Sequence, residues 1–372
     1  MTPSSVAEAA DLLRALGEAG TAVRPVGSGS RAGWGGGDRA AGVLDTAGLN
    51  RVVEHNPGDF TAVLECGVAL ADAQQLFASA GQWLALDPGS GGTIGGLVAT
   101  ADSGPARHRY GSVRDLVIGV TLVLSDGTVA RSGGRVIKNV AGYDLGKLFT
   151  GSFGTLGLVA QVAVRLHPLP SATATAVASF ADPSALAGAA AELSRRPLEA
   201  LCLDAGWHAG AGRLLVRFGG VTASRQASAV AALLGGLPGA GDAEVVEDDE
   251  RLWEAQRAGQ RSPDGVALKV SARPTDLALL ARTADEVGAG LVARAALGLA
   301  WLTLSGDAAP AESVARVRRA LAPRAVAVLD GGDRVPHPWP EIDAGVAALQ
   351  RRVKARFDPA RIFRPGAFVG GI

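Results

Sequence analysis

The residues best suited to hold a ligand lie in three glycine-rich blocks in the first half of the chain. These blocks cover residues 87–96, 109–115 and 142–157, and apolar, β-branched runs separate them. Glycine loses more chain entropy on folding than other residues, so it is retained where the backbone approaches another group closely or takes a positive φ. We therefore interpret the three blocks as the contact surface of a large bound cofactor.

A further glycine-rich run covers residues 27–37 and follows a predicted strand. Gly27, Gly29 and Gly33 are spaced one residue too far apart for the G-x-G-x-x-G dinucleotide-binding motif. Consecutive N–H groups in a loop of small residues form a nest that binds anions, which suits a pyrophosphate. A surface glycine turn is the alternative interpretation of this run.

The block at 87–96 contains a second candidate anion site. Thr93 is placed to cap a short helix whose first turn contains Gly95 and Gly96, two poor helix formers. A flat ring or a phosphate against that turn would explain both glycines, because a Cβ would collide with it and the N–H groups point outward. This pattern again favours a bound cofactor.

The block at 142–157 is not a nucleotide-binding P-loop. The spacing within residues 142–148 is wrong, and neither Ser nor Thr follows Lys147. We interpret Tyr143 as a packed aromatic residue and Asp144 as a helix cap rather than as catalytic groups.

Side chains able to move a proton or hold a carboxylate are scattered along the chain. The five histidines form no cluster, and a structural or exposed position is the alternative for each. His108 is the best candidate, because it lies between Arg107 and Arg109 next to the glycine-rich blocks. Lys269, on a predicted strand, is a further candidate, with a solvated lysine as the alternative. No metal site is expected.

Composition restricts the class of protein. The 372 residues suggest two or three domains, and 48% hydrophobic against 19% charged residues supports a large core. The formal net charge is zero, which gives no support for nucleic-acid binding. Cys66 and Cys202 lack metal-type spacing and indicate a reducing compartment. We see no signal peptide and no bilayer-spanning run, so we expect a cytoplasmic protein.

The elements that position the glycine-rich blocks are short strands with a few helices. A helix is expected at residues 4–20, where Ser4 or Ser5 and Glu8 suit a capping box. Asp126 and Gly127 give a strong hairpin signal. Strands are expected at 21–26, 43–44, 52–55, 62–65, 83–86, 117–124, 128–132 and 156–168, and helices at 70–80 and 95–100.

Beyond a proline-containing hinge at 168–170, the pattern predicts a second domain with an antiparallel sheet and helices on one face. Strands are expected at 175–180, 200–204, 213–218, 267–271, 290–295, 300–305 and 325–329, and helices at 183–194, 224–234, 275–287 and 311–321. A last helix at 342–357 precedes a tail that either simply ends or returns to cover the ligand. The predicted fold class is α+β, with domains at 1–170 and 171–335 and a C-terminal segment at 336–372.

Taken together, these motifs resemble the FAD-binding domain of the vanillyl-alcohol-oxidase/para-cresol-methylhydroxylase (PCMH) superfamily. The resemblance rests on residues 27–31, 93–96, 109–115, 142–157 and the tail at 357–366. Within the superfamily, the short chain and the run at 140–149 are most similar to the FAD-binding subunit of bacterial glycolate oxidase. The implied fold is a two-part PCMH-type FAD-binding domain with a smaller α+β cap domain that contains an antiparallel sheet.

The resemblance also implies roles for individual residues. Residues 27–31 match the pyrophosphate loop, although Ser28 and Ser30 stand where the family often has Gly and Thr. Arg364 replaces the usual Asn before Pro-Gly, and the absence of His from 27–36 implies non-covalent FAD. FAD contacts are implied for Pro25, Val26, Gly27, Ser28, Gly29, Ser30, Arg31, Pro88, Thr93, Ile94, Gly95, Gly96, Ala99, Thr100, Arg109, Tyr110, Gly111, Arg114, Gly154, Gly157 and Leu158.

Three functional hypotheses follow from the resemblance, with FAD as the redox group. The first is an FAD-binding subunit of a complex that oxidises glycolate to glyoxylate and passes electrons to a membrane acceptor. Its partners would be a second flavoprotein subunit and an iron–sulfur subunit, which would hold it at the inner face of the membrane. The second is a stand-alone oxidoreductase of a small 2-hydroxy acid or alcohol that uses Arg107, His108 or Lys269. The third is a non-catalytic assembly subunit.

Overall fold

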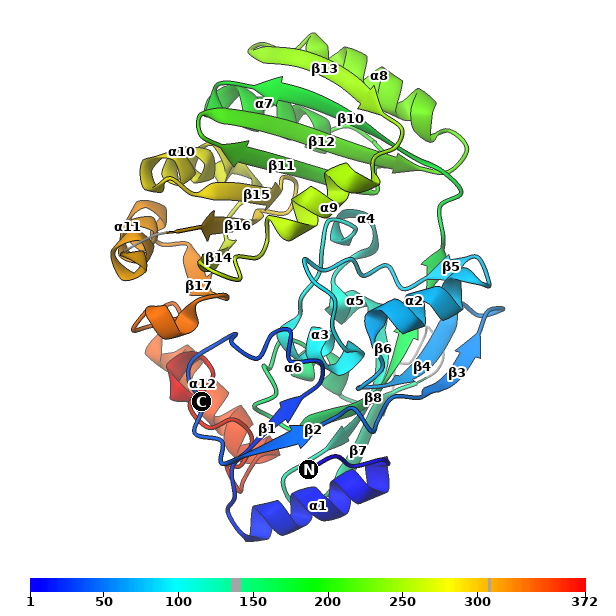
Figure 1. Ribbon diagram of the computed structural model, residues 1–372, viewed down its shortest axis with the longest axis vertical. Helices are drawn as coiled ribbons and strands as arrows, with labels where there is room; N and C mark the ends of the chain where they lie inside the picture. Colours follow the sequence, from blue (N-terminus) through cyan, green and yellow to red (C-terminus); the bar gives the residue numbers. More distant parts are fainter. Residues whose placement is uncertain (135–141, 307–308) are drawn as a thin grey trace.

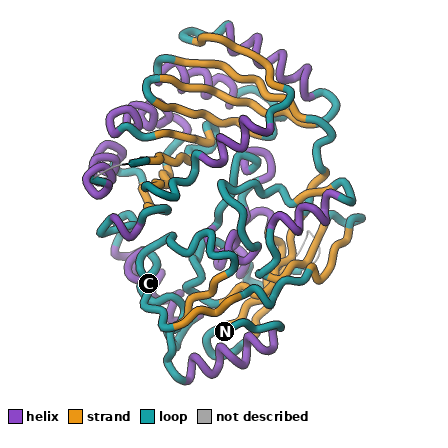
Figure 2. Tube along the Cα trace, viewed as in Figure 1, coloured by secondary structure: helices purple, strands orange, loops and turns teal. Residues whose placement is uncertain are grey.

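The computed structural model describes residues 1–134, 142–306 and 309–372. The molecule has a five-stranded sheet in one half and an eight-stranded sheet in the other. Loops and short helices occupy much of the region between the two sheets (Figures 1 and 2). This arrangement confirms the predicted α+β fold class.

The N-terminal half is built around an antiparallel sheet with the strand order β3-β4-β8-β6-β7. Two smaller pairs accompany it, β1 with β2 in parallel and β5 with β9. The strands are β1 (Val23–Val26), β2 (Gly42–Asp45), β3 (Val52–Asn56), β4 (Thr61–Glu65), β5 (Gln82–Trp83), β6 (Val117–Val123), β7 (Val129–Gly133), β8 (Leu158–Arg165) and β9 (His167–Pro168). The helices are α1 (Val6–Glu18), α2 (Leu70–Ala78), α3 (Ile94–Thr100), α4 (Arg107–Tyr110), α5 (Val113–Leu116) and α6 (Leu145–Phe149). The sequence predicts these strands, the three longer helices and the cap of α6 at Asp144, whereas α4 and α5 have no counterpart in the prediction.

The C-terminal tail lies against β1. The N–H of Val23 donates to the carbonyl of Ile362 at 2.7 Å, and the N–H of Arg364 donates to the carbonyl of Val23 at 3.1 Å. Ile362 and Phe363 are fully buried beside α1 and β1. The tail therefore returns to the N-terminal half, which is one of the two outcomes that the sequence leaves open.

The second half contains an antiparallel sheet with the strand order β13-β10-β12-β11-β15-β16-β14-β17. Its strands are β10 (Thr173–Phe180), β11 (Cys202–His208), β12 (Ala211–Gly219), β13 (Ala240–Val246), β14 (Val266–Ser271), β15 (Gly290–Arg294), β16 (Leu299–Leu304) and β17 (Ala325–Val328). Its helices are α7 (Pro183–Ser194), α8 (Ala223–Gly235), α9 (Glu250–Ala258), α10 (Leu277–Val287) and α11 (Pro310–Leu321). The sequence predicts all of them except β13 and α9. The division of the chain at residues 170 and 335 stays a prediction.

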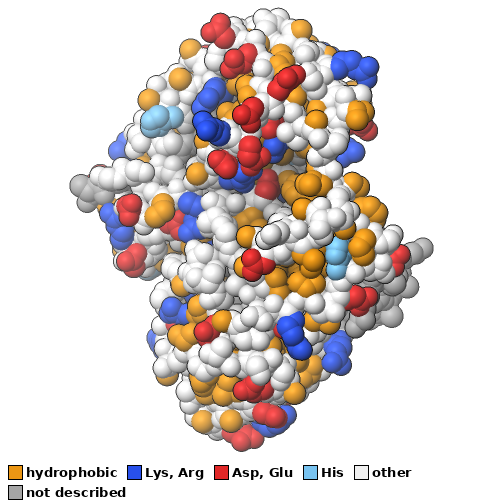
Figure 3. Space-filling view, turned by 45° about the vertical axis from the view of Figure 1, so that its right-hand side comes forward, with side chains coloured by type: hydrophobic (Ala, Val, Ile, Leu, Met, Phe, Trp, Pro, Cys, Tyr) orange, Lys and Arg blue, Asp and Glu red, His pale blue; other side chains and the backbone are white. Residues whose placement is uncertain are grey.

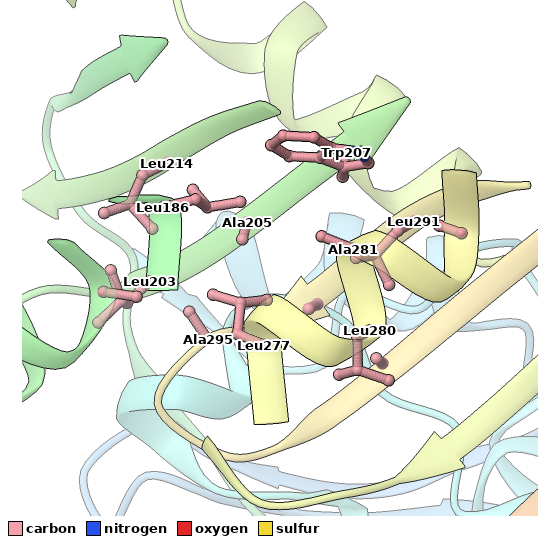
Figure 4. Close-up of a cluster of buried hydrophobic side chains, with 14 of the residues drawn as sticks. Leu186, Leu203, Ala205, Trp207, Leu214, Leu277, Leu280, Ala281, Leu291 and Ala295 are labelled. Carbon is pink, nitrogen blue, oxygen red and sulfur yellow. The ribbon is translucent and has the colours of Figure 1, made fainter. Parts of the chain in front are cut away.

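Four helices, α7, α8, α10 and α11, cover one face of the eight-stranded sheet. Figure 4 shows Leu186 of α7 and Leu277 of α10 packed with Leu203 and Trp207 of β11. These side chains are almost completely buried, so this layer forms the largest apolar core of the described residues. At about 25 cal/mol per Å² of buried apolar surface, it is the main source of stability in this half.

The helix α9 lies on the opposite face of the same sheet. Trp253 of α9 is fully buried, and its Nε1 donates to Oγ1 of Thr175 at 2.8 Å. Gln256 of α9 donates from Nε2 to Oδ2 of Asp204 at 3.1 Å. The prediction of helices on one face alone is therefore wrong. One buried tryptophan and polar contacts hold α9, so its sequence contains few apolar residues that would mark a packed helix.

The third glycine-rich block differs in part from its interpretation. Asp144 caps α6 as predicted, because its Oδ1 accepts the N–H of Lys147 at 3.2 Å. Tyr143 is 93% exposed, so its interpretation as a packed residue is wrong. Val140 and Ala141, the first residues of the run used for the resemblance, lie outside the described residues.

The last helix, α12 (Ala344–Phe357), anchors the tail through one buried lysine. Nζ of Lys354 donates to the carbonyl of Thr155 at 2.5 Å and to the carbonyl of Phe363 at 2.7 Å. It also forms an ion pair with Asp358 at 2.6 Å, and Asp358 is fully buried. Lys354 therefore joins the tail to the segment that precedes β8.

We predict that Lys354→Met lowers the free energy of unfolding by about 3–5 kcal/mol, because it leaves the Asp358 carboxylate buried without its cation. Urea denaturation of the full chain measures the loss. The control is Arg352→Met on the exposed side of the same helix, for which we expect a wild-type midpoint. Equal midpoints for the two variants would contradict the assigned role of Lys354.

Candidate functional site

Most of the predicted cofactor residues line a single cavity in the N-terminal half. The walls come from the loop after β1, from α3 and from the segment that enters β8. The predicted residues in this cavity are Pro25, Val26, Gly27, Ser28, Gly29, Ser30, Arg31, Thr93, Gly95, Gly96, Ala99, Thr100, Gly154, Gly157 and Leu158. Tertiary structure thus brings together three segments that are far apart in the sequence.

The loop at 27–31 has the form of an anion-binding nest. Among the described residues, none of the five backbone N–H groups of this loop donates to a protein acceptor. Gly29 has a φ of +73°, a conformation that L side chains rarely adopt. Free N–H groups in a glycine-containing loop suit the oxygens of a pyrophosphate.

Positive charge borders the same cavity. Arg24 and Arg364 both line it, and both bind the carboxylate of Asp38, at 2.7 Å and 2.9 Å respectively. Burial would raise the pKa of Asp38, but the hydrogen bonds from the two guanidinium groups lower it below its usual value. Two arginines with one carboxylate leave a net positive charge, which fits a dinucleotide diphosphate.

Arg31, which was predicted to contact FAD, has its guanidinium occupied by protein groups. Nη2 of Arg31 is 2.6 Å from Oδ2 of Asp102, and both side chains are 4% exposed. The same guanidinium donates to the carbonyls of Ser90 and Gly91. Arg31 therefore joins the loop at 27–31 to the segments before and after α3. Its backbone N–H remains free for a ligand among the described residues.

At two positions of the cavity, nearby protein atoms leave no room for a side chain larger than that of glycine. A Cβ on Gly27 would lie 2.0 Å from Oγ1 of Thr93. A Cβ on Gly95 would lie 2.6 Å from Cβ of Cys66, so the protein itself already excludes a side chain there. Thr93 occupies the N-cap position of α3, but its side chain makes no capping hydrogen bond. The expected Thr93 capping bond is therefore absent, whereas a ring or phosphate against the turn of Gly95 and Gly96 stays a prediction.

Six predicted FAD contacts lie outside this cavity. Ile94 is 1% exposed and packs into the apolar core. Pro88 and Tyr110 line a second cavity, and Tyr110 packs edge-on against Trp83 with ring centroids 5.4 Å apart. The others are Arg109, Gly111 and Arg114, of which both arginines are exposed. Their assignment to FAD stays a prediction.

Several lining residues have no counterpart in the sequence prediction. They are Arg24, Ala32, Thr46, Cys66, Phe153 and Val159, together with Arg364, for which the sequence left the role open. Arg24 lies in the strand directly before the nest, and this position in the sequence could have marked it as a lining residue. The tail arginine reaches the cavity only because the chain folds back on β1.

The catalytic candidates lie where the two halves meet. Arg107 and His108 are in α4, which contacts β11, and Lys269 is in β14. Burial lowers the pKa of Lys269, and the positive charge of Arg107 lowers it further, while Asp102 opposes both. Among the described residues, neither Arg107 nor Lys269 donates a side-chain hydrogen bond. Arg107 and Lys269 thus come from different halves, and they are close enough for the charge of Arg107 to lower the pKa of Lys269.

His108 is partly buried and follows Arg107 in α4. Its Nδ1 has no hydrogen-bond partner among the described residues. Burial lowers the pKa of His108, and Arg109 lowers it further. A neutral imidazole with an unpaired nitrogen is suited to accept a proton.

A second cavity lies between the halves, lined largely by apolar side chains. Figure 3 shows apolar side chains gathered where the two halves meet. Asp87 lines this cavity, and within the described part of the chain its carboxylate accepts only the N–H of Ala106, at 3.1 Å. Burial raises the pKa of Asp87 to about 7, against the opposing effects of the Ala106 hydrogen bond and the charges of Arg294 and Arg257.

Comparison with known proteins identifies the family. Residues 1–133 match the model of the FAD binding domain. The chain is 30% identical to the glycolate oxidase subunit GlcE of Escherichia coli K12 over 332 residues, 87% of this chain and 86% of that protein. The chain belongs to the FAD-binding protein family that includes GlcE. FAD is therefore its cofactor, and the free N–H groups and net positive charge of the first cavity fit it.

Other known proteins match over part of the chain or in fold alone. D-lactate dehydrogenase [cytochrome] 1 of Saccharomyces cerevisiae is 38% identical over 132 residues, which is 36% of this chain and 22% of that protein. A structure of alkyldihydroxyacetonephosphate synthase superposes with a TM-score of 0.71 at 14% identity, over 98% of this chain and 76% of that one. This chain is thus an FAD-linked oxidoreductase of the PCMH-type fold. Among the described helices, none has the length and apolar character needed to cross a membrane.

We predict that Gly27→Ala removes most of the bound FAD, because its Cβ would displace Thr93 at the edge of the cavity. The flavin absorbance of the purified full chain, relative to protein, measures occupancy. The control is Gly33→Ala, where a Cβ meets nothing within 4 Å. Full FAD occupancy in a folded Gly27→Ala variant would refute this prediction.

We predict that Asp87→Asn makes the free energy of unfolding less sensitive to pH. The folded chain keeps the Asp87 proton up to a pKa of about 7, whereas the ordinary value is 3.8. Ionisation of Asp87 therefore weakens the fold as pH rises from about 4 to about 7. We expect the variant to gain about 1–3 kcal/mol relative to wild type near pH 8.

Urea unfolding across this pH range measures the Asp87 effect, with the exposed Asp264→Asn as control. The amide keeps an acceptor for the Ala106 N–H, so the comparison isolates the charge. Parallel stability curves for wild type and Asp87→Asn would show that Asp87 ionises normally.

Proposed function

We propose that this chain oxidises a small 2-hydroxy acid, with glycolate as the substrate, and that it works as the FAD-binding subunit of a glycolate oxidase complex. The observation that carries the proposal is the pair of unpaired cations, Arg107 and Lys269, contributed by opposite halves. A carboxylate is the natural partner of two cations in a partly buried site. The full-length similarity to GlcE supports the same substrate class.

In this proposal, each residue has a separate task. Arg107 and Lys269 hold the substrate carboxylate and so orient the hydroxyl-bearing carbon. His108 accepts the hydroxyl proton at Nδ1, because burial and the nearby Arg109 keep the imidazole neutral at physiological pH. FAD, when bound, supplies the two-electron oxidant. The product of glycolate oxidation is glyoxylate.

The partners in the proposed complex are a second FAD-linked subunit and an iron–sulfur subunit. GlcE is named as a subunit of glycolate oxidase, which supports a multi-subunit complex for this chain as well. The resemblance of the sequence to glycolate oxidase subunits supports these two partners. Electrons would pass through the complex to a membrane acceptor. The chain would lie in the cytoplasm and reach the inner face of the membrane through its partners.

A second candidate is a stand-alone oxidoreductase that turns over its substrate without partners. The unpaired cations favour it, because they would give this chain a carboxylate site of its own. Anaerobic addition of glycolate to the isolated flavoprotein separates the two: bleaching favours the stand-alone enzyme, and bleaching only after the partner subunits are added favours the complex. A non-catalytic assembly role predicts no bleaching attributable to this chain in either case.

We predict that Arg107→Gln and Lys269→Met each raise the glycolate concentration for half-maximal flavin reduction by about 10- to 100-fold, since each removes a charged contact to the carboxylate. Stopped-flow absorbance under anaerobic conditions, in whichever assembly is active, measures it. The control is the exposed Arg225→Gln on α8. Wild-type concentration dependence in both variants would exclude the carboxylate site.

A further inference from the structure

Arg261, which follows α9, contacts two glycine-rich segments of the N-terminal half, the nest at 27–31 and the block at 87–96. Its Nη2 donates to the carbonyl of Ser30 at 3.1 Å, and its Nη1 donates to Oγ of Ser90. Ser30 belongs to the nest and lines the FAD cavity, whereas Ser90 belongs to the 87–96 block. One side chain from the second half therefore holds two loops of the first.

A buried carboxylate keeps Arg261 in place. Asp330 accepts Nε of Arg261 at 2.8 Å and Nη2 at 2.9 Å, in a bidentate pair. Asp330 also accepts the indole N–H of Trp34 at 2.8 Å, and the guanidinium lies 5.1 Å from the ring of Trp34. The Arg261 side chain is 15% exposed and Asp330 is 9% exposed. This arrangement fixes the guanidinium before any ligand arrives.

Three consecutive carbonyl groups of the nest, those of Gly29, Ser30 and Arg31, accept hydrogen bonds from protein donors. Gly29 accepts the N–H of Ala32 at 3.0 Å, and Arg31 accepts the N–H of Trp34 at 3.0 Å. The carbonyl of Ser30, between them, accepts Arg261. In a trans peptide the C=O and the following N–H point in opposite directions. A donor on the Ser30 carbonyl therefore fixes the direction of the free Arg31 N–H.

We propose that Arg261 is a positioning residue for the diphosphate of FAD. It acts through Ser30 by orienting the N–H groups of the nest, and it does not touch the phosphates. Its charge is neutralised by Asp330, so orientation rather than attraction is its contribution. Docking of the second half is thereby coupled to retention of the cofactor. The inference concerns FAD binding alone and stands or falls independently of the proposed substrate.

The test measures the affinity of the FAD-free full chain for FAD, ADP and adenosine in wild type and in Arg261→Gln. ADP carries a diphosphate, and adenosine has none. We expect Arg261→Gln to weaken FAD and ADP by about 10- to 100-fold and to leave adenosine unchanged. We expect Arg261→Lys to give the same pattern, because one ammonium cannot reach Asp330, Ser90 and Ser30 together.

Arg257→Gln is the matched control, since Arg257 lies on α9, is 18% exposed and, among the residues that the structure describes, forms its ion pair with Glu250 of the same helix. We expect it to bind all three ligands as wild type does. Equal losses for ADP and adenosine in the Arg261 variants would show a general structural effect and overturn the proposal, as would wild-type affinity for FAD. If Arg261→Gln does not fold, Arg261→Lys decides the question by the same comparison.

Discussion

The buried ion pair between Arg31 and Asp102 is the contact on which the first cavity, the candidate FAD site, depends. It joins the loop after β1 to the segment after α3, and 71 residues separate the two partners in sequence. With both side chains 4% exposed, loss of either partner would leave a buried charge, at a cost of about 3–5 kcal/mol. Because this pair fixes the two loops, the N–H groups of the nest and the wall formed by α3 face the same space.

Charged side chains are paired differently around the first cavity and in the region where the halves meet. Around the cavity, arginines are matched by carboxylates, so the phosphates of FAD would be met chiefly by backbone N–H groups and a modest net charge. In the second half, Arg294 and Asp204 form a fully buried pair, and Gln260 links Arg294 to the carbonyl of Ser103 in the first half. Burial raises the pKa of Asp204 to about 6, which Arg294 opposes.

Arg107 and Lys269 differ from these arginines, because no carboxylate forms an ion pair with either of them among the described residues. Unpaired charge in a partly desolvated position is costly unless a ligand supplies the counter-charge. That cost is the physical reason to connect Arg107 and Lys269 with an anionic substrate. Their location where the halves meet also means that a substrate there would contact both halves, and the cap would help define specificity as well as stability.

The sequence by itself determined the local elements, the cofactor class and most of the cavity lining. Helical spacing, the Asp126-Gly127 turn and the glycine-rich loops are local signals, and each depends on backbone preferences that act within a few residues. Only the tertiary structure decided that Arg31 binds Asp102, that Arg364 reaches the cavity and that Arg261 holds Ser30. It also placed α9 and excluded Ile94 and Tyr110 from the cavity. These contacts join residues far apart in the chain, where partner choice depends on packing geometry that no local pattern records.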